Sequence, residues 1–163
     1  MPAVMEGPLR DLNAWNPVGC SIAKALDLVG NKTVLLILRE AYYGTTRFES
    51  FARRVAVTDA VLAKHLRKMA DIGLLERRPY QNPGQRTRHE YVLAPMGRDL
   101  VPVVFALWQW GNKYLQEDGG PLHVVDHSGA QVRVGLRSDR DLDLEDVHVR
   151  VNRAWLRKHR PRT

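Results

Sequence analysis

Residues 58–73 read TDAVLAKHLRKMADIG, and this stretch decides the fold. Thr58 is of a type that caps helix N-termini, and Gly73 is of a type that ends helices. Apolar residues recur between them every three or four positions, which predicts an amphipathic helix over 59–72. The predicted buried stripe comprises Leu66, Met69 and Ile72 together with either Val61 or Leu62. The opposite face comprises Asp59, Ala60, Ala63, Lys64, Arg67 and Lys68.

Three more helices are predicted on the N-terminal side of this stretch. The first spans about 20–29 and stops at Gly30, and the second is capped by Asn31 and closed by Gly44. A short third helix begins at residues 46–49, which read TRFE and match a capping box. In such a box the Thr46 hydroxyl and the Glu49 carboxylate each accept a hydrogen bond from an otherwise unpaired backbone N–H.

A β-hairpin is predicted on the C-terminal side. Residues 74–80 and 88–93 have the composition of strands, and the segment between them contains the turn pair Pro83-Gly84. A helix follows from Pro95 to Leu115, because proline fits the first turn of a helix. Pro102 lies inside this span, so we expect a kink there.

The two ends of the chain are less regular. Residues 1–17 contain three prolines and few periodic apolar residues, so we interpret them as an N-terminal arm. Residues 18–116 then form one domain, and 117–163 form a C-terminal extension of mixed α/β character. The extension contains β-like runs at 123–126, 131–136 and 147–151, an acidic stretch at 139–146 and a basic tail at 153–162.

The composition is that of a globular protein, with 163 residues of which 44% are apolar and 26% charged. One cysteine excludes an internal disulfide framework and a cysteine-cluster zinc site. The longest uncharged stretch, 100–112, is too short to span a membrane, and no apolar signal segment opens the chain. We therefore expect a cytoplasmic protein with no membrane partner.

Positive charge is concentrated in the middle of the chain. The formal net charge is +7, and 18–116 carries 15 basic and 8 acidic residues. Within that range, 47–90 carries 10 basic against 5 acidic residues. A local basic excess of this kind is typical of a phosphate-binding surface, although a well-solvated protein surface has the same composition.

The order of the predicted elements indicates a winged helix-turn-helix, because two helices, a short helix, the 59–72 helix and a hairpin follow one another. The fold class is thus mainly α with a small β-hairpin wing, plus the extension. In such folds the second helix of the helix-turn-helix enters the DNA major groove, while the first crosses the backbone. The alternative for 59–72 is an ordinary amphipathic surface helix.

The predicted DNA contacts form three groups. Alanines near the start of the 59–72 helix allow close approach to base edges, and Lys64 and Arg67 reach bases or phosphates. Lys32 and Arg47 are candidate phosphate clamps near helix N-termini, and the wing arginines contact the backbone or minor groove. The alternative for each arginine is a surface charge without a partner. The full predicted set is Lys32, Arg47, Thr58, Asp59, Ala60, Ala63, Lys64, Arg67, Lys68, Arg77, Arg86 and Arg88.

Several segments resemble the HxlR family of bacterial transcription regulators. Residues 20–39 read CSIAKALDLVGNKTVLLILR and are similar to the start of that family, and 47–51 resemble its Arg-Phe-x-x-Leu step with Phe51 in the leucine place. Residues 58–77, 90–98 (EYVLAPMGR) and 107–111 (LWQWG) resemble its recognition segment, wing strand and long helix. The resemblance covers about 18–116. One departure is Thr33, where the family commonly has tryptophan.

The resemblance implies a homodimer that binds duplex DNA, with the first helix and the long C-terminal helix in the dimer interface. The residues agree, because the long helix has more apolar surface than a monomer core needs, and clustered tryptophan is common at interfaces. A two-fold dimer requires an inverted-repeat operator, with recognition helices about 34–36 Å apart. A helix fully buried in a monomer is the alternative. The predicted interface comprises Ile22, Leu26, Leu100, Val103, Val104, Leu107, Trp108, Trp110 and Leu115.

Cys20 lies at the start of the first predicted helix, where several HxlR-type regulators carry a cysteine that senses oxidants or electrophiles. The positive end of a helix dipole stabilises a thiolate, and Lys24 one turn later adds to this effect. A disulfide across the dimer, or alkylation, would shift the recognition helices. The alternative is that Cys20 is a small buried apolar residue.

Two other function classes stay open. A basic RNA-binding module shares the charge but not the apolar interface helix. An enzyme is not expected, because the chain has no phosphate loop, no His-Glu-x-x-His and no nucleophile elbow. His123, Asp126 and His127 have loosely metal-like content without further ligands, so neither a metal nor a cofactor is expected.

Overall fold

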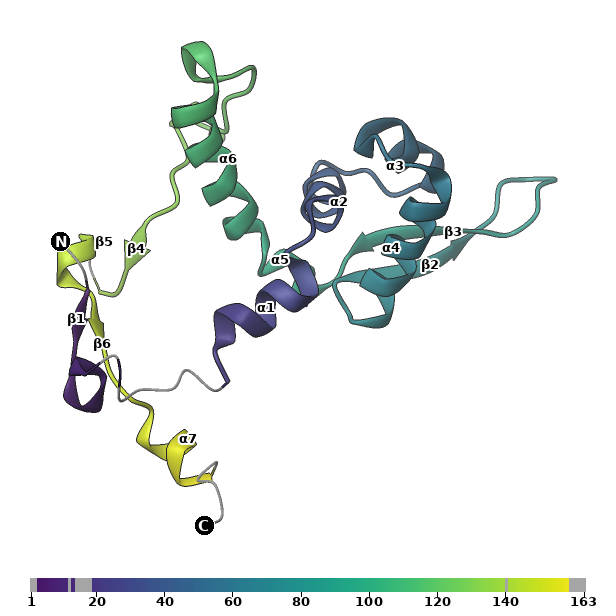
Figure 1. The fold of residues 1–163 in the computed structure, drawn as a ribbon. Coiled ribbons are helices and arrows are strands. Elements are labelled where there is room, and N and C mark those ends of the chain that lie inside the picture. Colours follow the sequence, from purple (N-terminus) through teal and green to yellow (C-terminus); the bar gives the residue numbers. More distant parts are fainter. Residues whose placement is uncertain (1–2, 12, 14–18, 140, 159–163) are drawn as a thin grey trace. The chain divides into compact units, whose positions relative to one another are not determined.

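The computed structural model describes residues 3–11, 13, 19–139 and 141–158, which form two compact units (Figure 1). One unit comprises 21–134, and the other combines the chain before it with the chain from 135 onward. The protein is mainly helical with small two-stranded sheets, as the sequence predicts. None of the helices in the described part of the chain is long and apolar enough to cross a membrane.

The larger unit has the element order of a winged helix-turn-helix, and the prediction of that fold is confirmed. Helices α3 and α4 form the helix-turn-helix, and strands β2 and β3 form the wing (Figure 1). The elements are α1 (Ser21–Val29), α2 (Lys32–Tyr42), α3 (Phe48–Val55), α4 (Asp59–Asp71), β2 (Leu75–Tyr80), β3 (Arg88–Leu93), α5 (Pro95–Arg98), α6 (Val101–Leu115) and the 3-10 helix η2 (Glu117–Gly119).

The core of this unit lies between α2, α3, α4 and the wing. Ile37, Phe51, Leu62, Leu66 and Leu74 are each 0% exposed. On α4 it is therefore Leu62 that faces the core, whereas its neighbour Val61 is 40% exposed. Leu62, Leu66 and Met69 form the predicted stripe, because residues three and four positions apart share one face of a helix.

The two simple helix caps are confirmed. The Asn31 side chain accepts a hydrogen bond from the Thr33 amide at 2.8 Å, and the Thr58 hydroxyl accepts one from the Val61 amide at 3.4 Å. Each satisfies a backbone donor that a helix N-terminus leaves unpaired.

The predicted capping box at 46–49 is wrong. Helix α3 has Arg47 at its N-cap and no side-chain cap. The carbonyl of Thr46 accepts a hydrogen bond from the Tyr91 amide of β3 at 2.8 Å, and the Glu49 carboxylate pairs with Arg88 at 2.6 Å. The Thr46 backbone and the Glu49 carboxylate are thus bound to the wing, because β3 packs against the start of α3.

The helix predicted over 95–115 is interrupted directly before Pro102. The helical segment is divided into α5 and α6, and Pro102 lies in the first turn of α6 rather than inside a continuous helix. Proline is tolerated there because first-turn amides have no helical partner. Gly97 lets α5 pack closely, since a Cβ atom at this position would lie 2.1 Å from the Leu74 carbonyl oxygen.

The wing is an antiparallel pair in register from Leu75–Leu93 to Tyr80–Arg88. Beyond α6, the predicted strands at 123–126 and 131–136 reduce to one bridge between Val125 and Gln131. Gln109 of α6 binds the following segment, donating to the Val132 carbonyl at 2.9 Å and accepting from the Val134 amide at 3.0 Å.

The smaller unit contains short elements with exposed surfaces. Its first strand pairs in parallel with its last, Val4 opposite His148 and Met5 opposite Val149. The last part of the predicted basic tail, 159–162, lies outside the described residues. The elements are β1 (Val4–Met5), η1 (Gly7–Arg10), β4 (Leu136–Arg137), β5 (Asp141–Leu142), η3 (Leu144–Asp146), β6 (His148–Val149) and α7 (Arg153–Lys158).

Candidate nucleic-acid interface

Helix α4 presents a basic face because its apolar face is anchored in the core. Leu62, Leu66 and Met69 are at most 1% exposed, which fixes the rotation of the helix about its axis. The outer face then carries exposed Lys64, Arg67 and Lys68, with small Ala60 exposed and Ala63 half-buried near the N-terminus. Thr58 and Asp59 are exposed at the start of the helix.

The wing carries Arg77 and Arg88 on its strands and Arg86 in its turn. The Arg77 guanidinium lies 3.0 Å from His89 Nδ1, so a hydrogen bond joins β2 to β3. Arg88 donates to the Glu49 carboxylate at 2.6 Å and links the wing to α3. Arg86 is exposed, and its side chain contacts no described residue through a hydrogen bond or ion pair.

Arg47 lies at the junction of α3 and the wing. Its guanidinium lies 4.7 Å from the centre of the Tyr80 ring, within cation–π range. The structure therefore brings three of the predicted DNA-contact arginines, Arg47, Arg77 and Arg88, to the part of the wing that faces the start of α3. Arg77 and Arg88 line a recess there with Phe48, Glu49, Tyr80, His89 and Tyr91.

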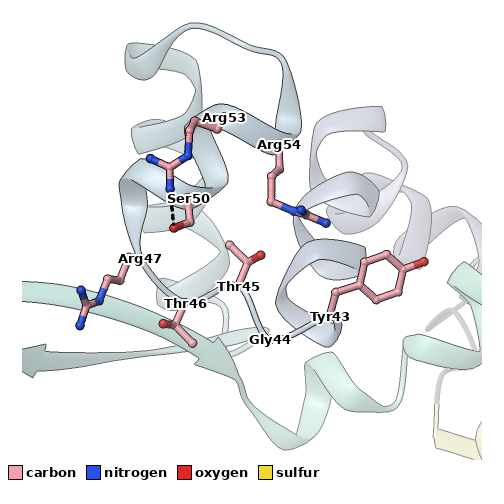
Figure 2. Close-up of a pocket in the computed structure, with 8 residues that line it drawn as sticks. All are labelled: Tyr43, Gly44, Thr45, Thr46, Arg47, Ser50, Arg53 and Arg54. Carbon is pink, nitrogen blue, oxygen red and sulfur yellow. Dashed lines mark hydrogen bonds between the residues drawn. The ribbon is translucent and has the colours of Figure 1, made fainter.

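A second recess lies at the turn between α2 and α3, and Figure 2 shows the side chains around it. We call it the turn pocket; its volume is about 600 Å³, and its lining includes Thr45, Thr46, Arg47, Ser50, Arg53 and Arg54. Arg53 donates to the Ser50 hydroxyl at 3.2 Å. Gly44 in the turn has a φ of +90°, a backbone conformation that favours glycine.

Sequence reasoning missed Ser50, Arg53 and Arg54 as site residues. Positions 47, 50, 53 and 54 follow three- and four-residue helical spacing, so they share one face of α3. This spacing was the available signal. The opposite face of α3 carries Phe51 and Val55, which are buried.

Arg54 binds a buried carboxylate beside the turn pocket. The Glu40 side chain is only 2% exposed and accepts hydrogen bonds from Arg39, at 2.7 Å, and from Arg54. The bond to Glu40 raises the pKa of the Arg54 guanidinium above its ordinary value, and the negative charge of Glu40 adds to this effect. Arg54 therefore joins α3 to α2.

Lys32 lies apart from the other predicted cations. It begins α2 and lines a different, more apolar recess with Leu35, Leu36, Val104, Leu107 and Trp108. The structure therefore does not bring Lys32 to the turn pocket or to the recess beside the wing.

Helices α1 and α6 expose large apolar side chains. Ile22 and Leu26 of α1 are 72% and 58% exposed, and Val29 is the one buried residue of that helix. Leu100 and Val104 differ from the rest of the predicted interface, because they pack against the core of their own chain. The outward set on α6 is Val103, Leu107, Trp110 and Leu115; the Tyr114 ring lies 5.5 Å from the Trp110 ring at a tilt of 49°, and Trp108 is half-buried.

Cys20 is exposed and directly precedes α1. Among the described residues, no group of three or more His, Cys, Asp or Glu side chains is arranged to hold a metal ion. His123 and His127 lie in the segment after α6, where Asp126 accepts hydrogen bonds from Ser128 and Ala130 in a tight turn.

Comparison with known proteins identifies relatives of the larger unit. The HxlR-like helix-turn-helix family matches residues 28–119. HTH-type transcriptional regulators of Mycobacterium tuberculosis and Mycobacterium bovis are 43% identical over 103 residues, which is 63% of this chain and 64% of theirs. The chain thus matches somewhat less than two thirds of the length of these relatives.

Solved structures extend the similarity. PA1607, described as a transcription factor, superposes with a TM-score of 0.71 at 31% identity, covering 83% of this chain and 95% of that chain. The transcription factor PA1374 from Pseudomonas aeruginosa gives a TM-score of 0.58 at 33% identity, covering 83% and 94%. The redox regulator HypR in its oxidized form gives 0.54 at 28% identity, covering 61% and 99%.

Proposed function

The chain belongs to the HxlR-like helix-turn-helix family, and from this premise we propose that it is a transcriptional regulator that binds an inverted-repeat operator as a homodimer. The observation that carries the proposal is the basic outer face of α4, held outward by a fully buried stripe next to a basic wing. A fixed helix with small residues near its N-terminus fits the major groove.

The proposed DNA contacts divide by role. Lys64, Arg67, Ala60 and Ala63 on α4 face base edges, with Thr58, Asp59 and Lys68 around them. The cations Lys32, Arg47, Arg77, Arg86 and Arg88 bind phosphates, which positions the protein without reading sequence. Of the wing arginines, Arg86 is the one without an intramolecular partner among the described residues, so it reaches DNA at the smallest cost in broken contacts.

The exposed faces of α1 and α6 support the homodimer. An amphipathic helix that buries a single side chain in its own chain gains stability by packing against another chain. The exposed apolar residues of α1 and α6 supply such a surface, with Trp110 and Tyr114 as aromatic anchors of the kind enriched at interfaces.

The test combines a mass measurement with a binding comparison. Analytical ultracentrifugation of the full chain is expected to give twice the 18.6 kDa chain mass. Selection from random duplexes is expected to yield an inverted repeat, and fluorescence anisotropy to show tighter binding to that duplex than to single-stranded DNA or RNA. A monomer would contradict the dimer, and a preference for single-stranded RNA would favour the RNA-binding alternative.

A redox response through Cys20 is the second part of the proposal. Its support is the exposed thiol before α1 and the similarity to HypR, which is described as a redox regulator. Oxidation by diamide, which accepts two electrons and two protons, would join the Cys20 thiols of two copies in a disulfide. Diamide is expected to weaken operator binding by the parent but not by Cys20→Ser, and equal responses would exclude the sensor.

A further inference from the structure

The turn pocket is lined by three arginines, and within the described part of the chain only one of them is used in an ion pair that holds the fold together. Arg47, Arg53 and Arg54 all line it, yet only Arg54 forms an ion pair, with Glu40. Figure 2 shows that the Arg54 side chain extends toward α2, whereas the Arg47 and Arg53 side chains extend away from α2. Two cations on that side therefore have no carboxylate partner among the described residues.

Neutral donors surround these two cations. Ser50 accepts a hydrogen bond from Arg53 at 3.2 Å, which holds the guanidinium against α3 and leaves its other N–H groups available. The hydroxyls of Thr45 and Thr46 line the same pocket and form no hydrogen bond with the described residues. Guanidinium and hydroxyl donors of this kind fit the oxygens of a phosphate group, which accept several hydrogen bonds at once.

The start of α3 adds to this preference. Because the capping box does not form, α3 has no side-chain cap and its first amides have no helical partner. The carboxylate that the box would have placed there, Glu49, instead pairs with Arg88 of the wing. An oxyanion near this helix start is stabilised by the free amides and the helix dipole.

We propose that the turn pocket binds a backbone phosphate of the operator through Arg53 and Arg47, with Ser50 positioning the Arg53 guanidinium. The inference rests on the proposed function and deepens it, because it assigns a DNA contact to Arg53 and Ser50. The pocket lies on the first helix of the helix-turn-helix, the helix that crosses the DNA backbone while α4 enters the groove. It contributes affinity and orientation and no sequence preference.

The test measures duplex affinity against salt for the full-length parent, Arg53→Ala, Arg53→Lys and the control Arg133→Ala. Arg133 is an exposed arginine of the segment after α6. Arg53→Ala is expected to lower affinity about tenfold, equally for operator and unrelated duplex, and to reduce the salt slope by about 1.8, which is about 0.9 for each of the two protomers. Arg53→Lys should restore most of the slope, and Arg133→Ala should change neither quantity. If the parent binds duplex DNA but Arg53→Ala has the same affinity and salt slope, the turn pocket does not bind a backbone phosphate. The proposal that the protein is a transcriptional regulator would then be unaffected.

A second measurement separates DNA from free phosphate as the source of the ligand. Inorganic phosphate is titrated into the parent while the arginine Nε–Hε signals are followed by NMR, with the Arg53 signal assigned from Arg53→Lys. Weak binding of tens of millimolar, together with the duplex effect, supports a backbone phosphate. The DNA assignment would be overturned if inorganic phosphate saturated the Arg53 signal below one millimolar while Arg53→Ala left duplex affinity unchanged. The same conclusion would hold if the parent bound no duplex.

Discussion

Helices α4 and α6 have similar lengths, 13 and 15 residues, but their own chain buries them to very different degrees. Leu62, Leu66 and Met69 of α4 are at most 1% exposed, whereas Val101 is the one buried residue of α6. The contrast separates two roles for an amphipathic helix. A helix fixed by its own core can present its polar face to a ligand, while a helix with an exposed apolar face requires a partner chain.

The largest expected effect tests the buried side of this comparison. Leu66→Ala removes a fully buried side chain and leaves a cavity, so the free energy of unfolding should fall by about 2–5 kcal/mol. Urea denaturation followed by circular dichroism measures this change. Lys68→Ala, on the exposed face of the same helix, should stay within about 0.5 kcal/mol. Equal effects of the two substitutions would show that α4 is not anchored through Leu66.

The next effect tests the exposed side. Leu107→Glu places a carboxylate in the proposed dimer interface, where an unpaired buried charge costs about 2–5 kcal/mol. Sedimentation should show a dimer dissociation constant raised at least about thirtyfold, with helical circular dichroism retained because Leu107 is half-exposed in one chain. Gln116→Glu, just past α6, adds the same charge and should leave the dimer intact. A Leu107→Glu dimer of parental affinity would place the interface elsewhere.

A smaller effect distinguishes base reading by α4 from phosphate binding by the wing. Arg67→Ala should weaken operator binding by about 1–3 kcal/mol and alter sequence preference if it contacts a base edge. Arg86→Ala should weaken all duplexes alike and lower the salt slope by about 1.8, which is about 0.9 for each of the two protomers. Anisotropy titrations on operator and scrambled duplexes measure both quantities. A uniform loss in Arg67→Ala would mean that α4 binds phosphates only.

The smallest expected effect concerns the pairing of β1 with β6. This pairing has neither a buried apolar stripe like that of α4 nor an exposed apolar face like that of α6. Hydrogen bonds from Arg150 and then His148 lower the pKa of Glu6 to about 2 from the ordinary 4.5. The ionised Glu6 thus stabilises the pairing above about pH 4.5, and this contribution is lost as the pH falls toward 2. The Glu6 amide, which donates to the Val149 carbonyl at 3.0 Å, should lose its NMR signature of pairing across that window.

The matched variant for this pH effect is Glu6→Gln. It keeps the shape of the side chain but carries no titrating carboxylate. Its Glu6-position amide signal should therefore be insensitive to pH between 4.5 and 2. A parental titration curve in the variant would assign the pH effect to another group.

Sequence signals that act within a few residues, such as helix caps, correctly predicted where helices begin and end. Asn31 and Thr58 cap their helices, and glycines follow α2 and α4, because each acts on backbone groups within a few residues. The buried stripe of α4 was predicted for the same reason, except that periodicity alone could not choose between Val61 and Leu62. The core made that choice by burying Leu62.

Competing partners from distant chain overturned local signals. The Glu49 carboxylate is placed to complete a capping box, yet Arg88, about forty residues later, binds it instead. The helix predicted over 95–115 divides into α5 and α6, and Gly97 of α5 closely approaches Leu74. Neither contact leaves a trace in the local spacing of residues.

The sequence by itself determined the helix-turn-helix order, the basic face of α4, the wing and the apolar character of α6, because periodicity and capping act within a single element. Only the tertiary structure decided which arginines are neutralised and which remain available. Arg54 pairs with buried Glu40, Arg88 pairs with Glu49, and Arg53 has no carboxylate partner among the described residues. Charge pairing depends on distances between elements, and packing in three dimensions sets those distances.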